Sequence, residues 1–213
     1  MTFAPHPIDP LLDAVLEEAA FSGWAEGLFA KAGAGRALEP AAFAARFPGG
    51  VDDALVAFAD WADEAMIATL AGEDLGAMKI RARVTLAVRA RFEALGTYKT
   101  AARRAAAALA LPHRAGLGAR LLWRTSDRVW RALRDPSVDF NYYSKRAILC
   151  GVIGSTFAAW ASADDPQIAW DFLDRRIENV MQFETLKRQV KPLERAAEEA
   201  VAFLGGLRHG RRG

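Results

Sequence analysis

The sequence has little of the chemistry that holds a metal ion. Its 213 residues include one cysteine, Cys150, and three histidines, His6, His113 and His209. None of the histidines stands in a Glu-x-x-His or His-Glu-x-x-His arrangement, and a single cysteine cannot form an internal disulfide or a paired-cysteine metal site. The sequence therefore predicts no metal centre, which argues against a metal enzyme such as a di-iron hydroxylase.

The usual motifs of covalent catalysis and nucleotide binding are also missing. There is no Gly-x-Ser-x-Gly motif and no P-loop. The glycine pairs at 33–35 and 116–118 lack the third glycine and the preceding strand of a dinucleotide site. We therefore expect a protein that is not an enzyme and that uses no cofactor.

Long hydrophobic runs and targeting patterns are absent as well. The longest apolar stretch, 147–161, is shorter than the roughly 20 residues that span a bilayer, and it is interrupted by Gly151 and Gly154. Residues 1–7 match neither a secretory signal nor an Arg-rich transit peptide. The sequence predicts a bacterial-type cytoplasmic chain without a targeting segment, in which residues 147–161 form a buried helix.

Runs of alternating β-branched or aromatic residues, typical of strands, do not occur. The composition is instead 52% hydrophobic and 25% charged, with abundant alanine, leucine, glutamate and arginine. These residues favour helices, and the length suits one packed domain. The neighbours of Cys150 are apolar, so its thiol should be inert. The expected fold class is all-α.

The positions of proline and glycine predict where the helices begin and end. Asp9-Pro10 is a cap followed by a first-turn proline, and 33–35 and 48–50 are glycine-containing breaks. Three short helices should therefore precede a longer one that starts near Val51, as in a helix-turn-helix protein. The later helices are expected near 51–72, 78–95, 97–110, 114–134, 140–161 and 166–204.

These elements divide the chain into three predicted parts within one compact domain. Residues 1–50 form a helix-turn-helix-like part, and residues 51–188 form a larger helical bundle. Residues 189–213 form an amphipathic helix with a basic tail. This last segment could lie on a membrane surface or pack back on the core or an oligomer partner, and the sequence leaves both open.

The helix-turn-helix arrangement raises the possibility of DNA binding, but the side chains argue against it. The helix in the recognition position, 40–47, offers alanines and phenylalanines, with Arg46 as its sole cation. Base readout and phosphate neutralisation need polar and cationic side chains. We expect no specific nucleic-acid binding. A TetR-type transcriptional regulator that binds DNA and a small apolar effector remains the alternative.

Arginines form a stripe in the basic middle of the chain. Arg120, Arg124, Arg128 and Arg131 recur at helical spacing on one face. Such a stripe is commonly a solvated face beside a buried one. The alternative is attraction to anionic lipid head groups or to an acidic partner.

Two dense motifs carry a family resemblance. Residues 139–146 read Asp-Phe-Asn-Tyr-Tyr-Ser-Lys-Arg, and residues 170–177 read Trp-Asp-Phe-Leu-Asp-Arg-Arg-Ile. Together they resemble the motifs of the Coq-nine family of ubiquinone-biosynthesis accessory proteins. The similarity is strongest between about 120 and 185 and is looser at the Phe-Pro turn near 46–51.

This resemblance implies a TetR-like helical bundle that has lost DNA binding and holds a lipid tail. It implies a homodimer that associates peripherally with the inner membrane. The bound lipid would be an isoprenoid quinone precursor or a phospholipid, presented to the demethoxyubiquinone hydroxylase. The implied task is substrate delivery, without bond chemistry.

Candidate residues for these two roles follow from the motifs and from large apolar groups at core spacing. Ordinary core packing is the competing interpretation of the lipid-binding set. We predict that the lipid-binding residues are Trp123, Trp130, Ile153, Phe157, Trp160, Leu173 and Met181. The predicted partner-binding residues are Asp139, Asn141, Tyr142, Tyr143 and Arg175, of which the tyrosines match the family's aromatic pair. The competing interpretation is a capped helix start at Asp139 or Asn141, with Asp171 paired to Arg175.

Overall fold

The first part of the structure consists of three short helices. The computed structural model describes residues 6–136 and 140–182. The three helices are α1 (Pro10–Ser22), α2 (Leu28–Gly33) and α3 (Pro40–Arg46). Asp9 caps α1, since its carboxylate accepts a hydrogen bond of 2.9 Å from the Leu11 amide. The predicted start of the first helix is confirmed.

A bundle of longer helices follows. Its elements are α4 (Val51–Ala71), the 3₁₀ turn η1 (Leu75–Ala77), α5 (Ile80–Gly96), α6 (Lys99–Leu109), α7 (Ala115–Ala132) and α8 (Phe140–Ser162). A further helix begins at residue 166 and is described as far as residue 182. The expected bounds agree with the described helix ends to within a few residues. The expected end of the last helix at residue 204 and the predicted segment 189–213 lie outside the described residues.

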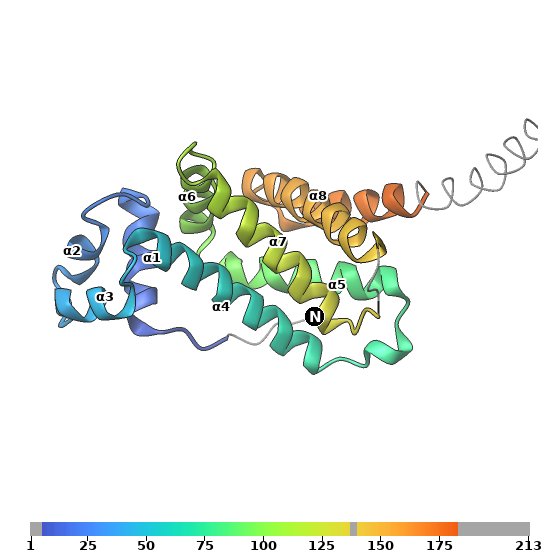
Figure 1. The fold of residues 1–213 in the computed structure, drawn as a ribbon, viewed down its shortest axis with the longest axis horizontal. Coiled ribbons are helices and arrows are strands. Elements are labelled where there is room, and N and C mark those ends of the chain that lie inside the picture. Colours follow the sequence, from blue (N-terminus) through green and yellow to red (C-terminus); the bar gives the residue numbers. More distant parts are fainter. Residues whose placement is uncertain (1–5, 137–139, 183–213) are drawn as a thin grey trace, which may run out of the picture. The chain divides into compact units, whose positions relative to one another are not determined.

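The described residues contain helices, turns and loops but no strand, so the all-α class is confirmed. In the bundle α4 packs along α5 and α7, and α7 packs along α8. Figure 1 shows α1, α2 and α3 together at one end, beside the long helices. This arrangement agrees with the TetR-like helical bundle expected from the resemblance.

The chain forms two compact units, residues 1–173 and residues 174–213. The first contains α1 to α8 and the start of the helix at 166. In the second, the described residues 174–182 are helical. The boundaries expected at residues 50 and 188 stay predictions.

Aromatic rings give the N-terminal helices a small core of their own. The ring of Phe29 stacks on Phe43 and Phe47, with centroid distances of 5.6 and 5.4 Å. Phe43 and Phe47 are both almost completely buried. The two phenylalanines of the segment in the recognition position therefore face inward.

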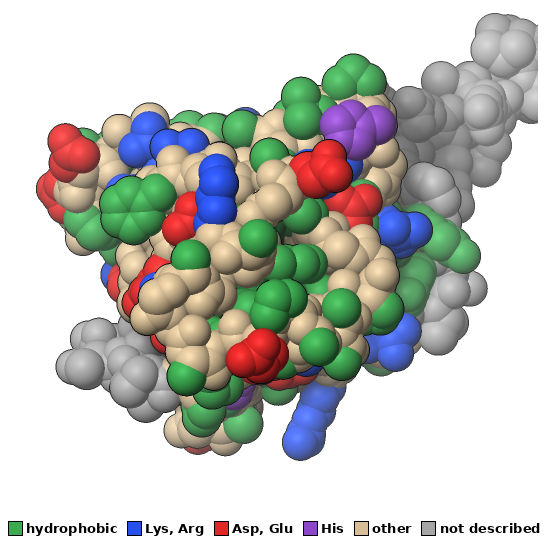
Figure 2. All heavy atoms as spheres, turned by 90° about the vertical axis from the view of Figure 1, so that its left-hand side faces the viewer, with side chains coloured by type: hydrophobic (Ala, Val, Ile, Leu, Met, Phe, Trp, Pro, Cys, Tyr) green, Lys and Arg blue, Asp and Glu red, His purple; other side chains and the backbone are tan. Residues whose placement is uncertain are grey.

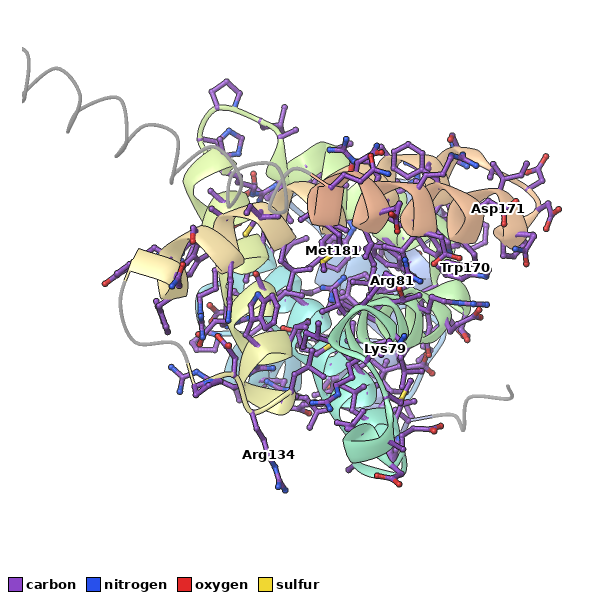
Figure 3. The ribbon with its side chains drawn as sticks, turned by 90° about the vertical axis from the view of Figure 1, so that its right-hand side faces the viewer. Lys79, Arg81, Arg134, Trp170, Asp171 and Met181 are labelled. Atoms are coloured by element: carbon purple, nitrogen blue, oxygen red, sulfur yellow. The ribbon has the colours of Figure 1, made fainter. Side chains whose placement is uncertain are left out.

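The turn after α7 ends the helix with an unusual residue. Arg134 has a φ of +56°, the left-handed conformation that glycine normally occupies at this position. The Asp135 amide donates to the Trp130 carbonyl and the Arg134 amide to the Arg131 carbonyl, both at 3.0 Å, which is the Schellman pattern. Figure 3 shows the Arg134 side chain pointing away from the helices.

Replacing Arg134 with glycine should stabilise the protein. A side chain in this conformation costs roughly 1 kcal/mol, and glycine removes that cost. We expect the free energy of unfolding of Arg134→Gly to rise by about 1 kcal/mol, measured by urea denaturation. Arg134→Ala loses the same exposed side chain but keeps the strained backbone, so it should show no such gain. Equal stability of the two variants would contradict the prediction.

Candidate functional site

A cavity of about 440 Å³ lies in the first unit, and helices α4 to α8 all contribute to its wall. It is open to solvent beside Ala110, Ala115 and Ala119, which are exposed. This volume falls in the range of small-molecule pockets. Most of the wall is apolar. The lining residues are Leu55, Phe58, Ala59, Arg91, Leu95, Ala102, Ala105, Ala106, Leu109, Ala110, Ala115, Gly118, Ala119, Leu121, Leu122, Thr125, Ile153, Gly154 and Phe157.

Small residues on α6 and α7 make room for the cavity. Ala102, Ala105 and Ala106 recur on one side of α6, where larger side chains would fill the space. Gly118 lets α7 approach the end of α6, because a Cβ atom there would lie 3.1 Å from the Leu109 carbonyl oxygen. The cavity therefore results from the small side chains on the sides of α6 and α7 that line it.

The polar part of the wall consists of Arg91 and Thr125. Arg91 Nε donates to Asp63 Oδ1 at 2.7 Å, and Thr125 Oγ1 donates to the same carboxylate at 3.0 Å. Asp63 is completely buried. The two lining groups share one acceptor, so they lie side by side at a single end of the cavity.

A second carboxylate extends this cluster toward the surface. Asp60 Oδ1 pairs with Arg124 at 2.9 Å and with Arg128 at 2.8 Å. Arg128 also reaches Asp63 Oδ2 at 3.8 Å. We call Asp60, Asp63, Arg91, Arg124 and Arg128 the ion cluster. It joins α4, α5 and α7 beside the polar end of the cavity.

The ion cluster also accounts for much of the arginine stripe. Arg124 and Arg128 pair with Asp60, and Arg131 pairs with Asp127 at 2.6 Å. Three of the four stripe arginines thus have an acidic partner. Ion pairs within the protein thus hold most of the stripe, which favours the first of its two interpretations.

The predicted lipid-binding residues occupy several different places. Ile153 and Phe157 line the cavity. Trp160 stacks on Phe92, and the ring of Phe157 lies 5.6 Å from that of Trp160. This aromatic group therefore borders the cavity through Phe157.

The remaining predicted lipid-binding residues do not line the cavity. Trp123 stacks on Tyr143, and Trp130 donates a hydrogen bond to the Lys145 carbonyl at 3.3 Å. Leu173 is completely buried in the first unit. Met181 lies beyond Leu173 in the second unit. Their contact with a lipid stays a prediction.

The sequence reasoning missed Arg91, Thr125 and the alanines of α6. The alanine-rich segment 97–118 carried little signal, because helix propensity alone explains alanine. The available signal was an arginine on an otherwise apolar helix face: Arg91 lies between Val88 and Leu95, both buried, at i+3 and i+4 spacing. A charge at such a position requires a buried partner.

Aromatic side chains form a second feature on the outside of α7 and α8. The ring of Tyr143 lies 5.1 Å from that of Tyr142 and 6.4 Å from that of Trp123. Tyr143 is 61% exposed. We call these three residues the tyrosine surface. Its exposed ring beside partly buried ones has the composition of an interface anchor.

The Lys-Arg pair of the first motif holds this surface in place. Arg146 is buried and its guanidinium stacks 3.4 Å above the Tyr142 ring. Arg146 and the Tyr142 hydroxyl both donate to Asp127, at 2.7 and 2.9 Å. Lys145 pairs with Asp135 at 2.6 Å. The basic residues of the motif thus fix the start of α8 to α7.

Asp127 is held in its charged form by these contacts. Partial burial acts to raise its pKa, but hydrogen bonds from Arg146, Tyr142 and Arg131 outweigh burial and lower the pKa below its ordinary value. Asp127 therefore stays ionised at neutral pH. The anchor of the tyrosine surface does not depend on pH in the physiological range.

The other predicted partner-binding residues are not all beside the tyrosines. Asn141 is exposed at the start of α8. Asp139 lies outside the described residues, and Arg175 belongs to the second unit. In the second motif, Trp170 lies under the Arg89 guanidinium at 5.1 Å, and Asp171 accepts a hydrogen bond from Gln167 at 2.7 Å. The partner role of all five residues stays a prediction.

Cys150 lies on the α8 side that faces α7. Its thiol donates to the Leu122 carbonyl at 3.6 Å, and burial raises its pKa. A raised pKa leaves little reactive thiolate at neutral pH. This agrees with the inert thiol expected from its apolar neighbours.

The exposed side of α3 offers little to nucleic acid. Arg46 pairs with Asp9 at 2.5 Å, so the cation of this helix is already neutralised. Figure 2 shows acidic, basic and apolar side chains mixed over the end of the molecule formed by α1 to α3, without a continuous basic patch among the described residues. Phosphate binding depends on such a patch.

Two kinds of structure are absent from the described residues, 6–136 and 140–182. No helix among them is both long and apolar enough to cross a membrane. No group of three or more histidine, cysteine or acidic side chains there is arranged to hold a metal ion.

Residues 115–184 match a protein-family model, and the family is COQ9. This segment contains α7, α8, the tyrosine surface and the helix from residue 166. The resemblance predicted from the two motifs is thus confirmed. The walls that α4, α5 and α6 give to the cavity lie outside the matched segment.

Several curated proteins are similar to the chain over about 90 residues. The "Ubiquinone biosynthesis protein COQ9, mitochondrial" of Bos taurus is 34% identical over 90 residues, which cover 41% of this chain and 28% of that protein. The protein of the same name from Rattus norvegicus is 34% identical, with 29% of its length covered. The Homo sapiens protein is 32% identical, with 28% covered. The match thus spans less than a third of each relative.

Proposed function

We propose that this chain is a lipid-binding accessory protein of ubiquinone biosynthesis. The observation that carries the proposal is an apolar cavity of about 440 Å³, partly walled by the segment that matches the COQ9 family. The relatives are named as ubiquinone biosynthesis proteins. The ligand we propose is an isoprenoid quinone precursor, with a phospholipid as the other candidate.

The physical basis of binding is burial of the isoprenoid tail. Removing apolar surface from water gains about 25 cal/mol per Å². Leu55, Phe58, Leu121 and Ile153 present such a surface inside the bundle. A lipid tail there exchanges the bilayer for a similarly apolar wall, so its transfer in either direction changes the free energy little.

The tyrosine surface supports the second half of the proposal, presentation to a partner. We propose that the demethoxyubiquinone hydroxylase docks on the predicted partner-binding residues, with Tyr142 and Tyr143 as its anchors. We also propose that the chain itself neither makes nor breaks a bond in the lipid. We further propose a homodimer that associates peripherally with the membrane. Aromatic anchors with a charged neighbour such as Asp127 are typical of interface hot spots.

Native mass spectrometry of the gently purified chain tests the proposal directly. We expect a co-purifying lipid that denaturing extraction releases and identifies as an isoprenoid or a phospholipid. An empty protein whose melting temperature no isoprenoid quinone raises would overturn the lipid-carrier proposal. If such a protein also shifted an operator fragment, the TetR-type regulator would become the better account.

Tyr143→Ala should weaken binding to the hydroxylase without affecting the fold. The side chain is 61% exposed, so its loss leaves no cavity in the core. Truncating an interface hot spot costs at least about 2 kcal/mol, which is roughly a 30-fold loss of affinity. Isothermal titration calorimetry with the purified hydroxylase measures this affinity.

Phe21→Ala is the matched control for this prediction. Phe21 is 81% exposed and lies on α1, which carries no part of the tyrosine surface, so its removal takes away a similar aromatic ring outside that surface. The control should bind the hydroxylase as the unsubstituted chain does. Undiminished binding by Tyr143→Ala would remove the interface assignment.

A further inference from the structure

We propose that the cavity selects amphiphiles whose polar end carries a hydrogen-bond-accepting oxygen, and that the Arg91 guanidinium holds this oxygen. The inference rests on the proposed function, because it assumes that the cavity binds a lipid. It adds the chemical class of the ligand's head and the residue that recognises it.

Arg91 has more hydrogen-bond donors than its contacts use. A guanidinium carries five N–H groups, and Arg91 uses the one on Nε for Asp63, at 2.7 Å. Within residues 6–136 and 140–182, its two terminal nitrogens have no hydrogen-bond acceptor. The side chain keeps 13% of its surface exposed while it lines the cavity. Four N–H groups thus have no acceptor among the described residues, on a side chain that lines the cavity.

The charges of the ion cluster do not balance. Three guanidinium groups, those of Arg91, Arg124 and Arg128, share the two carboxylates of Asp60 and Asp63. The five residues of the cluster thus carry one more positive than negative charge, and Arg91 is the cluster residue that lines the mostly apolar cavity wall. A cation in such surroundings favours an electron-rich oxygen, such as that of a quinone, ketone or phenolate, over a plain hydrocarbon.

The polar and apolar parts of the cavity wall are separated along α7. Thr125, next to Arg91, and Ala115 both line the cavity from α7, and they are ten residues apart in sequence. At 1.5 Å per residue, this places the polar end about 15 Å from the wall at the start of α7. The wall toward that other end is formed by alanines, leucines and Gly118. A head at Arg91 leaves that length for the tail.

The polar end of the cavity is the end nearer to the tyrosine surface. Ser126 Oγ donates to the Arg146 carbonyl, and the Cys150 thiol donates to the Leu122 carbonyl, so α7 and α8 run antiparallel in a fixed register. Thr125 is level with the first turns of α8, and Tyr143 lies one turn before Arg146. A head at Arg91 thus lies at the end of the helix pair where the partner is proposed to dock.

A competition between two ligands with the same tail tests the inference. The probes are farnesylacetone, which has a ketone oxygen, and the hydrocarbon of equal length in which a methylene replaces the carbonyl. Both are offered in detergent micelles to the full chain, and native mass spectrometry gives the ratio of the two complexes. The ratio is corrected for the distribution of the probes in protein-free micelles. We expect about tenfold more ketone complex, since hydrogen bonds from charged groups contribute that much.

A double variant removes the donor without leaving an unpaired buried charge. In Asp63→Asn/Arg91→Met the preference for the ketone should fall about tenfold, while the hydrocarbon still binds. The matched control is Asp60→Asn/Arg124→Met, which removes a pair of the same charges that does not line the cavity. It should keep the preference of the unsubstituted chain.

The outcomes separate the inference from the proposed function. Equal binding of ketone and hydrocarbon by the unsubstituted chain would overturn the inference and leave the lipid carrier standing, and this result does not depend on any variant folding. An unchanged preference in the Asp63→Asn/Arg91→Met protein would also overturn it. Binding of neither probe, with no lipid on the purified chain, would overturn the proposed function and the inference with it.

Discussion

Replacing Asp63 with alanine should lower the free energy of unfolding by about 3–5 kcal/mol. The carboxylate is completely buried and accepts hydrogen bonds from Arg91 and Thr125. Without it, the Arg91 charge remains inside the bundle with no partner, and breaking a buried pair in this way costs several kcal/mol. Urea denaturation followed by circular dichroism measures the change.

The neighbouring Glu64 provides the control for this prediction. It carries the same charge one position along α4, but its side chain is exposed. Glu64→Ala should therefore change stability by no more than about 0.5 kcal/mol. If Asp63→Ala were as stable as Glu64→Ala, the ion cluster would have no part in holding α4 to α5 and α7.

Filling the cavity should abolish lipid binding while the fold persists. Ala106 lines the cavity from α6 and is only partly buried, so a tryptophan there can occupy the space that a tail would use. We expect Ala106→Trp to lose co-purifying lipid by at least about tenfold, the equivalent of 1.4 kcal/mol. Denaturing extraction and mass spectrometry quantify the lipid per chain.

Ala107→Trp is the matched control on the same helix. Ala107 is exposed and does not line the cavity, so the added indole should point to solvent. This variant should retain the lipid of the unsubstituted chain. Equal lipid content in folded Ala106→Trp protein would place the ligand somewhere other than this cavity.

The helices could be predicted because their ends carry local signals. Asp9 and Pro10 mark the start of α1 through a hydrogen bond within two residues, and the glycines at 49 and 50 mark the break before α4. Such contacts depend on neighbouring residues alone. The all-α class follows from the same local preferences.

The cavity could not be predicted in the same way. It lies where side chains are small, as at Ala105 and Gly118, whereas the sequence reasoning selected large apolar residues. Large residues fill space, and Trp160 accordingly stacks on Phe92. The pairing of Asp63 with Arg91, 28 positions away, depends on how α4 packs on α5, and periodicity within one helix cannot show it.

The first motif indicates which residues lie on the surface, but it does not show which residues hold them in place. The tyrosine pair was recognised as a candidate partner site, and Tyr143 is exposed as an anchor requires. The motif by itself assigns no role to Lys145 and Arg146. Their partners, Asp135 and Asp127, come from the end of α7 and the turn that follows it.

The stacking of Arg146 on Tyr142 has a consequence for the entropy of association. The Tyr142 ring is held from one side by the guanidinium and at its hydroxyl by Asp127. Its rotational freedom is therefore lost when the chain folds. Ordering a side chain at an interface otherwise costs about 0.5–1.5 kcal/mol during binding. A protein that docks on the tyrosine surface meets a ring whose orientation is already set, so more of the contact energy remains as affinity.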